Sequence, residues 1–203
     1  MQKPAPKPTP SSKSYLEAIR KVTGELTSTL DVADVFKDVV RLTAEATKAK
    51  GSALRLLDER TRRLELSASW GLSAGYLAKG PIDGGSSLSA CMNGDIVHIR
   101  DVRTDPRVQY PGEAAAEGIA SMLSVPMVLR GRVIGVVRLY SAESRDYSEE
   151  EMEFLRALAD LGALAIEHAR LYSSLKADHE SLIGEFHAWF ESSVYPPESV
   201  PRL

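Results

Sequence analysis

The hydrophobic pattern of the chain changes its period, and this change locates the two main elements. Within residues 122–140, two β-branched apolar runs flank Arg130-Gly131. Glycine at such a reversal favours a tight turn because it accepts a positive φ, so the stretch predicts a β-hairpin. After the hairpin, apolar residues recur every three or four positions, which predicts a long amphipathic helix. Ser148 and Glu151 have the spacing of a capping box at its start.

Two shorter helices are expected before the hairpin. Apolar residues from about Ser14 recur at helical spacing. Asp31 is placed to cap a second helix, which we expect to end at Gly51 because glycine commonly terminates helices.

Strands are expected between the second helix and the hairpin. Leu64, Leu66 and Ala68 alternate with polar residues, as in a half-buried antiparallel strand, and a short strand is expected at residues 96–99. The mixed order of elements lacks a regular strand–helix alternation, which favours an α+β class. We expect a central antiparallel sheet with helices packed on its faces.

Two irregular stretches, residues 71–94 and 101–119, retain apolar and aromatic side chains. Six of the 14 glycines lie in the first stretch. Long connections of this composition commonly cover a pocket. Small alanines in both stretches leave room for a bound molecule.

The run Ser124–Tyr172 (SVPMVLRGRVIGVVRLYSAESRDYSEEEMEFLRALADLGALAIEHARLY) resembles the C-terminal half of a GAF domain, a small-molecule-sensing relative of PAS domains. Gly118-Ile119, the SVP triplet, the segment at residues 131–135 and the final AIEHARLY carry the resemblance. It implies a GAF/PAS-like central antiparallel sheet of five or six strands, helices on both faces and a long C-terminal helix. A ligand chamber would lie between the sheet and the two irregular stretches.

The domain boundaries follow from the extent of this resemblance and from composition. Residues 1–13 are expected to form a disordered Pro-rich leader, and residues 14–173 to form the GAF domain. Residues 174–191 are expected to extend the C-terminal helix for dimerisation, followed by a flexible tail at residues 192–203.

The resemblance implies a sensory or regulatory module that binds a small molecule and signals through dimeric terminal helices. The candidate ligand-binding residues are Leu54, Leu56, Trp70, Tyr76, Ile82, Ser86, Leu88, Cys91, Asp101, Arg107, Ile119 and Ser124. The alternative is a ligand-free dimerisation or scaffold module, since many GAF domains keep the fold without a pocket. Bulky side chains filling the chamber would favour that alternative.

An apolar seam along the C-terminal helix predicts a homodimer. Its residues recur at alternating spacings of four and three, as in a coiled coil. The predicted interface residues are Leu161, Ala165, His168, Tyr172, Leu175, His179, Leu182 and Phe186. The two histidines offer a further hypothesis, in which their protonation weakens the pairing near pH 6.

The sequence does not favour an enzyme. Cys91 is interpreted as a small buried residue. Tetrapyrrole-binding GAF domains carry His directly after their Cys, whereas Met92 stands here, and a single Cys lacks the exchange partner that GAF-type sulfoxide reductases use. Cyclic-nucleotide binding stays a minor alternative, because the Asn-Lys pair of that signature does not occur. No catalytic residue, metal site or cofactor is identified.

Composition restricts the partners. The net charge of −3 and the pI near 5.9 give no basic field for nucleic acid. No apolar run reaches the ~18 residues of a membrane helix. The single Cys fits a reducing cytoplasm. We therefore expect a cytoplasmic homodimer with an unidentified small-molecule ligand and a signalling partner protein in trans.

Overall fold

The computed structural model describes residues 12–28, 31–80, 82–83 and 88–194. Within them, six antiparallel strands form one sheet of order β3-β2-β1-β6-β5-β4. The strands are β1 (Gly51–Asp58), β2 (Arg63–Trp70), β3 (Ile82–Asp83), β4 (Val97–Ile99), β5 (Ser121–Leu129) and β6 (Arg132–Ser141). The helices are α1 (Ser12–Ser28), α2 (Val32–Thr47), α3 (Ala74–Leu77), α4 (Ser89–Met92), α5 (Pro111–Ala116) and α6 (Glu149–Val194).

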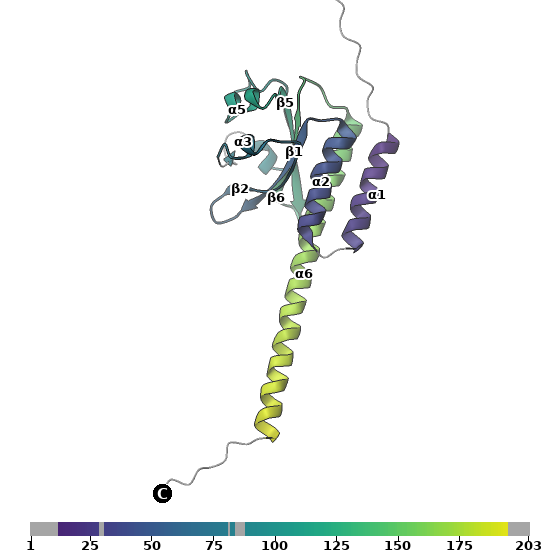
Figure 1. Ribbon diagram of the computed structural model, residues 1–203, viewed down its shortest axis with the longest axis vertical. Coiled ribbons are helices and arrows are strands. Elements are labelled where there is room, and N and C mark those ends of the chain that lie inside the picture. Colours follow the sequence, from purple (N-terminus) through teal and green to yellow (C-terminus); the bar gives the residue numbers. More distant parts are fainter. Residues whose placement is uncertain (1–11, 29–30, 81, 84–87, 195–203) are drawn as a thin grey trace, which may run out of the picture.

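The sheet separates two layers of different character. Helices α2 and α6 pack on one face and α1 packs against both of them, while α3 and α5 lie on the other side (Figure 1). We call these the helix face and the loop face. The predicted α+β fold, with a central antiparallel sheet, helices on both faces and a long C-terminal helix, is confirmed.

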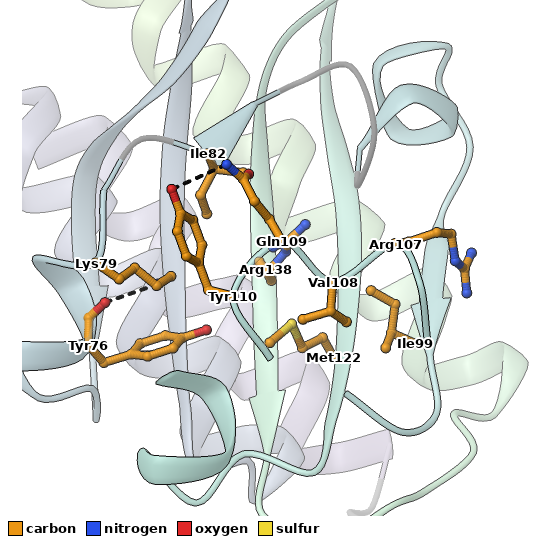
Figure 2. A pocket seen from close by; sticks show the side chains of 10 residues that line it. All are labelled: Tyr76, Lys79, Ile82, Ile99, Arg107, Val108, Gln109, Tyr110, Met122 and Arg138. Atoms are coloured by element: carbon orange, nitrogen blue, oxygen red, sulfur yellow. Dashed lines mark hydrogen bonds between the residues drawn. The ribbon is translucent and has the colours of Figure 1, made fainter. Parts of the chain in front are cut away.

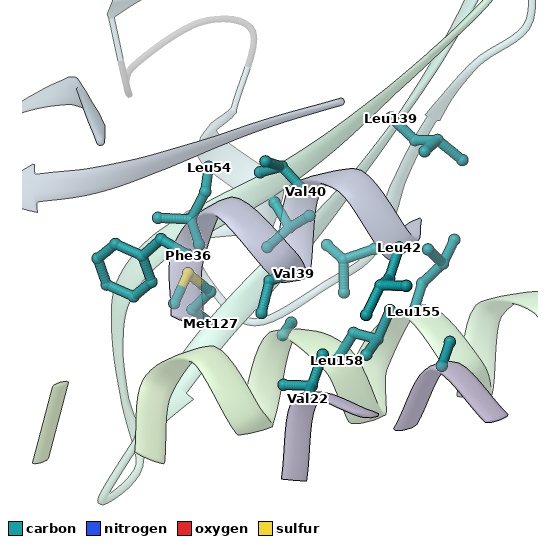
Figure 3. Packing of buried hydrophobic residues seen from close by; sticks show 14 of the residues in the cluster. Val22, Phe36, Val39, Val40, Leu42, Leu54, Met127, Leu139, Leu155 and Leu158 are labelled. Carbon is teal, nitrogen blue, oxygen red and sulfur yellow. The ribbon is translucent and has the colours of Figure 1, made fainter. Parts of the chain in front are cut away.

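The largest apolar cluster fills the helix face (Figure 3). Val39 of α2, Leu54 of β1 and Leu158 of α6 are buried in it. Two smaller clusters lie on the loop face, one around Tyr76 and Tyr140 and the other around Leu64 and neighbouring residues. The helix face therefore carries most of the apolar burial that stabilises the fold.

The central hairpin and the start of α6 have the predicted local structure. Arg130 and Gly131 both have positive φ, at 50° and 76°, as a two-residue turn between twisted strands requires. At the helix start, the Glu151 amide donates to Ser148 Oγ at 3.1 Å, and the Ser148 amide donates to Glu151 Oε2 at 3.1 Å. Both predictions, the hairpin and the capping box, are confirmed.

The predicted end of α2 at Gly51 is wrong. The helix ends at Thr47, and Lys48 takes the left-handed conformation with φ 53°. Its amide bonds back to the carbonyls of the last turn. Gly51 instead begins β1, where a Cβ would lie 2.5 Å from the Trp70 carbonyl oxygen. This glycine permits close strand approach and does not terminate a helix.

A bulge in β2 also changes the predicted alternation. Leu54 pairs with Ala68, whereas the next residue, Arg55, pairs with Leu66. One residue of β2 is therefore extra, and the side chains on either side of it change faces. Leu64 packs on the loop face and Ala68 on the helix face. The prediction that they share a face is wrong for this reason.

The last helix extends well beyond the sheet (Figure 1). Its final buried residue among those with described side chains is Ile166, and from His168 onward the described side chains are exposed or half-buried. In the described part of the chain, no helix combines the length and the apolar character that crossing a membrane requires.

Candidate functional site

A small cavity lies on the loop face, between the sheet and the connections that cover it (Figure 2). It is lined by Tyr76, Lys79, Ile82, Ile99, Arg107, Val108, Gln109, Tyr110, Met122 and Arg138. Its volume is about 10 Å³, which is roughly the space that one water molecule needs. A larger molecule can enter only if the covering side chains move.

The strands form the floor of this cavity. Ile99 of β4 pairs with Met122 of β5, and Ser124, two residues further along, pairs with Arg138 of β6. Paired residues and their second neighbours point to the same face of an antiparallel sheet, so Ile99, Met122 and Arg138 converge. A single charged group thus lies among apolar floor residues.

The roof comes from two connections that are far apart in sequence. Lys79 follows α3, and its Nζ donates to the Tyr76 carbonyl at 3.1 Å while lying 3.3 Å from the centre of the Tyr76 ring. The second connection precedes α5, where Gln109 Nε2 donates to the Tyr110 hydroxyl at 3.2 Å (Figure 2). A Cβ at Gly80, whose φ is 116°, would lie 2.9 Å from that hydroxyl. The two roof segments therefore meet closely.

The cavity carries a positive field. Burial lowers the pKa of Lys79 to about 8, and the positive charges of Arg55 and Arg138 lower it further against the opposing effect of Glu117 and Glu113. An ammonium group is destabilised where cations gather and water is partly excluded. The site therefore favours an anionic or neutral ligand over a cationic one.

Three of the predicted ligand-binding residues line the cavity, namely Tyr76, Ile82 and Arg107. The Arg107 side chain is engaged at the rim. Its Nε donates to Asp105 Oδ1 at 2.9 Å, and its Nη2 donates to the His98 carbonyl at 2.9 Å. The Asp105 carboxylate and its hydrogen bonds raise the pKa of Arg107.

Four others are buried on the loop face without lining the cavity, namely Leu88, Cys91, Ile119 and Ser124. Ser124 Oγ accepts a hydrogen bond from Arg138 Nε at 2.8 Å, so it orients a cavity residue. Burial raises the pKa of Cys91 to about 12, which keeps the thiol protonated and unreactive near neutral pH.

The remaining predicted residues lie elsewhere. Leu54 and Leu56 pack with the helix-face cluster, because alternate residues of β1 point to opposite faces. Trp70 is 46% exposed at the end of β2. Asp101 is engaged by Arg103 in a surface ion pair of 2.7 Å. We leave these four out of the candidate site; the position of Ser86 lies outside the described residues.

Sequence reasoning missed most of the lining, namely Lys79, Ile99, Val108, Gln109, Tyr110, Met122 and Arg138. One signal was available. Arg138 is the single charge within the apolar run of β6, and Arg55 similarly lies between leucines of β1. A charge inside a continuously apolar strand marks a buried polar site, because such strands are covered on both faces.

The predicted dimer seam divides into two parts. Ala165 is only 3% exposed, and Leu161 packs against the same helix-face cluster, which includes α1. These two residues are thus covered within their own chain. The other predicted residues, His168, Tyr172, Leu175, His179, Leu182 and Phe186, are exposed.

Comparisons with known proteins agree with this architecture. The GAF domain family model matches residues 29–167. The GAF domain of a phosphoenolpyruvate-protein phosphotransferase from Coxiella burnetii superposes with a TM-score of 0.71 at 24% identity, covering 81% of this chain and 99% of that one. Free methionine-R-sulfoxide reductase from Neisseria meningitidis, solved with its substrate, gives 0.68 at 23% identity, covering 83% and 98%.

One curated relative matches a shorter region. The methyl sulfide methyltransferase-associated sensor of Methanosarcina acetivorans is 33% identical over 90 residues, which is 43% of this chain. The match spans only 9% of the length of that sensor.

Proposed function

The chain belongs to the GAF domain family, and from this premise we propose that it is a regulatory module that binds a small molecule on the loop face and signals through a dimer of α6. The similarity to part of a curated sensor supports a sensory role. The proposed role is non-enzymatic, although one structural neighbour is a reductase.

The observation that carries the binding proposal is the polar cavity on the loop face. Binding sites are typically concave and mostly apolar, with a few converging polar groups. Here Lys79 and Arg138 converge over Ile99 and Met122. The covering segments consist of short helices and irregular connections, which open at lower free-energy cost than the helix-face core. A ligand would therefore enter by displacing roof side chains such as Tyr110.

The second part of the proposal concerns α6. Exposed apolar side chains continue along the helix beyond the sheet, including Leu175 at 68%, Leu182 at 65% and Phe186 at 61% exposure. Their spacing of seven and four residues places them on one side of the helix. A second copy of the same helix offers the matching surface, which fits a two-fold pairing. The dimer contact would begin near His168, where burial within the chain ends.

Ligand binding is tested by native mass spectrometry of the purified protein. We expect a retained small molecule in the native spectrum, released when the protein is denatured. Recovery of the bare chain alone, under conditions that preserve other noncovalent complexes, would contradict the proposal.

A ligand-free dimerisation module is the second candidate function. The cavity volume of about 10 Å³ favours it, because the chamber is nearly filled by side chains. A cyclic nucleotide would need a much larger displacement of the covering side chains than a compact molecule, so the same observation disfavours that alternative. The two main candidates differ in whether any small molecule changes the thermal stability of the protein.

A further inference from the structure

Two arginines from neighbouring strands point to the loop face. Arg55 of β1 pairs with Val136, and Arg138 of β6 pairs with Ala53. The four residues form two adjacent cross-strand pairs two residues apart, so all of their side chains lie on the same face. Arg138 lines the cavity, and Arg55 lies close enough for its charge to lower the pKa of Lys79.

Both guanidinium groups are buried and incompletely hydrogen-bonded. The exposed fractions of Arg55 and Arg138 are 6% and 7%. Arg55 Nη1 donates to the Leu64 carbonyl at 3.4 Å, and Arg138 Nε donates to Ser124 Oγ at 2.8 Å. Arg55 Nε, Arg55 Nη2 and Arg138 Nη2 have no hydrogen-bond partner. The Tyr140 hydroxyl also lies within hydrogen-bonding reach of Arg55, and none of these acceptors is a carboxylate.

This arrangement is costly in the absence of a further partner. A buried charge is normally paired, and buried polar atoms are almost always hydrogen-bonded. Among the described side chains, none of the salt bridges involves Arg55 or Arg138. Lys79 adds a third cation at the same cavity. Arg138 and Lys79 therefore line the cavity itself, and Arg55 lies near enough for its charge to act on Lys79.

We propose that this cavity binds a small anion, a carboxylate or phosphate group, through Arg138, Arg55 and Lys79. The proposal rests on the proposed function and specifies its ligand class. Guanidinium groups present pairs of N–H donors whose geometry matches the oxygens of either group, and such charge-assisted hydrogen bonds are among the strongest in proteins. The unpartnered donors of Arg138 and Arg55 would then be satisfied.

The neighbouring residues suit such a ligand. Burial raises the pKa of Tyr76, so its phenol stays protonated and able to donate a hydrogen bond. The Tyr76 ring packs edge-on against Tyr140, with 5.7 Å between ring centres, which provides an apolar wall beside the cations. The rest of the ligand must be compact, because the space about Arg138 is small until Gln109 and Tyr110 move.

Isothermal titration calorimetry at fixed ionic strength tests the proposal with defined probes. The anionic series is acetate, succinate and inorganic phosphate, and the neutral series is acetamide and succinamide. We expect anions to bind and their neutral counterparts not to bind. Acetate or succinate binding without phosphate binding would indicate a carboxylate ligand, and the reverse a phosphate ligand.

Substitution of the arginines by methionine provides the second arm. Arg138→Met and Arg55→Met should each weaken anion binding at least tenfold, while the melting temperature of the ligand-free protein stays equal or rises, because an unpaired buried charge has been removed. Arg103→Met removes an exposed arginine that pairs with Asp101, and it should leave anion affinity unchanged.

The outcomes separate this inference from the proposed function. If native mass spectrometry or calorimetry detects a neutral ligand while the anions fail to bind, the anion class is overturned and sensing stands. If nothing binds in either assay, both proposals fall. A lower melting temperature of ligand-free Arg138→Met and Arg55→Met, without anion binding by the wild type, would assign these arginines a structural role.

Discussion

At the scale of one residue, Arg138 illustrates how the proposed binding function would conflict with stability. Its guanidinium is 7% exposed, and one of its terminal nitrogens lacks a hydrogen-bond partner. An uncharged, apolar side chain of similar length, such as methionine, would avoid the cost of burying that charge. Binding sites commonly carry such unfavourable residues because the ligand supplies the missing interactions.

Lys79 should make anion affinity depend on pH. Its pKa is lowered to about 8 in the free protein by burial and by Arg55 and Arg138, opposed by Glu117 and Glu113. As pH rises from 7 to 9, Lys79 loses its charge, so succinate affinity should fall by up to about tenfold. Calorimetry across this range measures the effect, and succinate remains fully ionised throughout.

Lys79→Met is the control for this titration. It should bind succinate more weakly at pH 7 and show almost no change in affinity up to pH 9. An equally steep pH dependence in Lys79→Met would assign the titration to another group. In the ligand-free protein, folding stability depends on pH in the opposite direction to anion affinity. The lowered pKa of Lys79 reduces the free energy of unfolding below pH 8, and this loss is relieved as pH rises toward 10.5.

Cys91 should be inert in the native protein. Burial raises its pKa to about 12, and the side chain is fully buried. At pH 8 the thiolate fraction should be roughly a thousandfold below that of an unfolded chain. Modification by a chromogenic disulfide reagent should therefore be very slow until denaturant is added. Rapid labelling of the native protein would contradict this prediction and make Cys91 a candidate for a reactive thiol.

The residues of the site could be predicted only in part. Aromatic and apolar residues in the two irregular stretches indicated a covered pocket, and Tyr76 and Ile82 line it. The sequence does not reveal which face a strand residue occupies when neither face is solvent-exposed, and Leu54 was assigned to the wrong one for this reason. Arg55 stands between Leu54 and Leu56, where an alternating strand pattern predicts a solvent-facing side chain, whereas Arg55 is buried.

At the scale of elements, close strand packing depends on Gly135 in β6. A Cβ there would lie 2.5 Å from the Arg55 carbonyl oxygen on β1. Gly135→Ala should therefore force the two strands apart and lower the free energy of unfolding by about 2 kcal/mol or more. Chemical denaturation measures this change. Gly135→Ala should also weaken anion binding, because Arg55 would shift.

Gly184→Ala is the matched control. Gly184 lies in α6 with no atom within 4 Å of an added Cβ, so alanine should raise the stability of this helix by about 0.8 kcal/mol or less. Equal effects of the two substitutions would refute the close-contact explanation for Gly135.

The elements themselves were largely predictable because local signals decide them. The turn at Arg130-Gly131 and the capping box at Ser148 depend on the conformational preferences of residues that are close together in the sequence, so the sequence alone indicates them. The end of α2 and the bulge in β2 were missed. Both depend on how strands pair in the folded protein. Gly51 has no side chain because the Trp70 carbonyl lies close to it, and the bulge in β2 exists only relative to the paired residues of β1.

At the scale of the whole molecule, α6 joins the folded body to an exposed apolar surface. We expect the wild type to sediment as a dimer at tens of micromolar. The double variant Leu175→Glu/Leu182→Glu should sediment as a monomer, because two like charges per helix would face each other across the seam. Analytical ultracentrifugation measures both.

Ser181→Glu is the control for the added charge. Ser181 is exposed and lies away from the seam by helical spacing, so this variant should remain dimeric. A monomeric wild type at these concentrations would rule out the proposed dimer. A cooperative melting transition in all three proteins, lowered in the double variant by no more than the lost pairing accounts for, would show that the charges leave the sheet and its core intact.

The length of α6 sets the physical form that any signal can take. From Ile166, its last buried residue among those described, the helix runs to Val194, which corresponds to roughly 40 Å at 1.5 Å per residue. This exceeds the ~10 Å over which salt screens exposed charges. The charge of a bound molecule would therefore be screened before the far end of α6, so we expect the proposed signal to travel as a rotation, tilt or sliding of the helix itself.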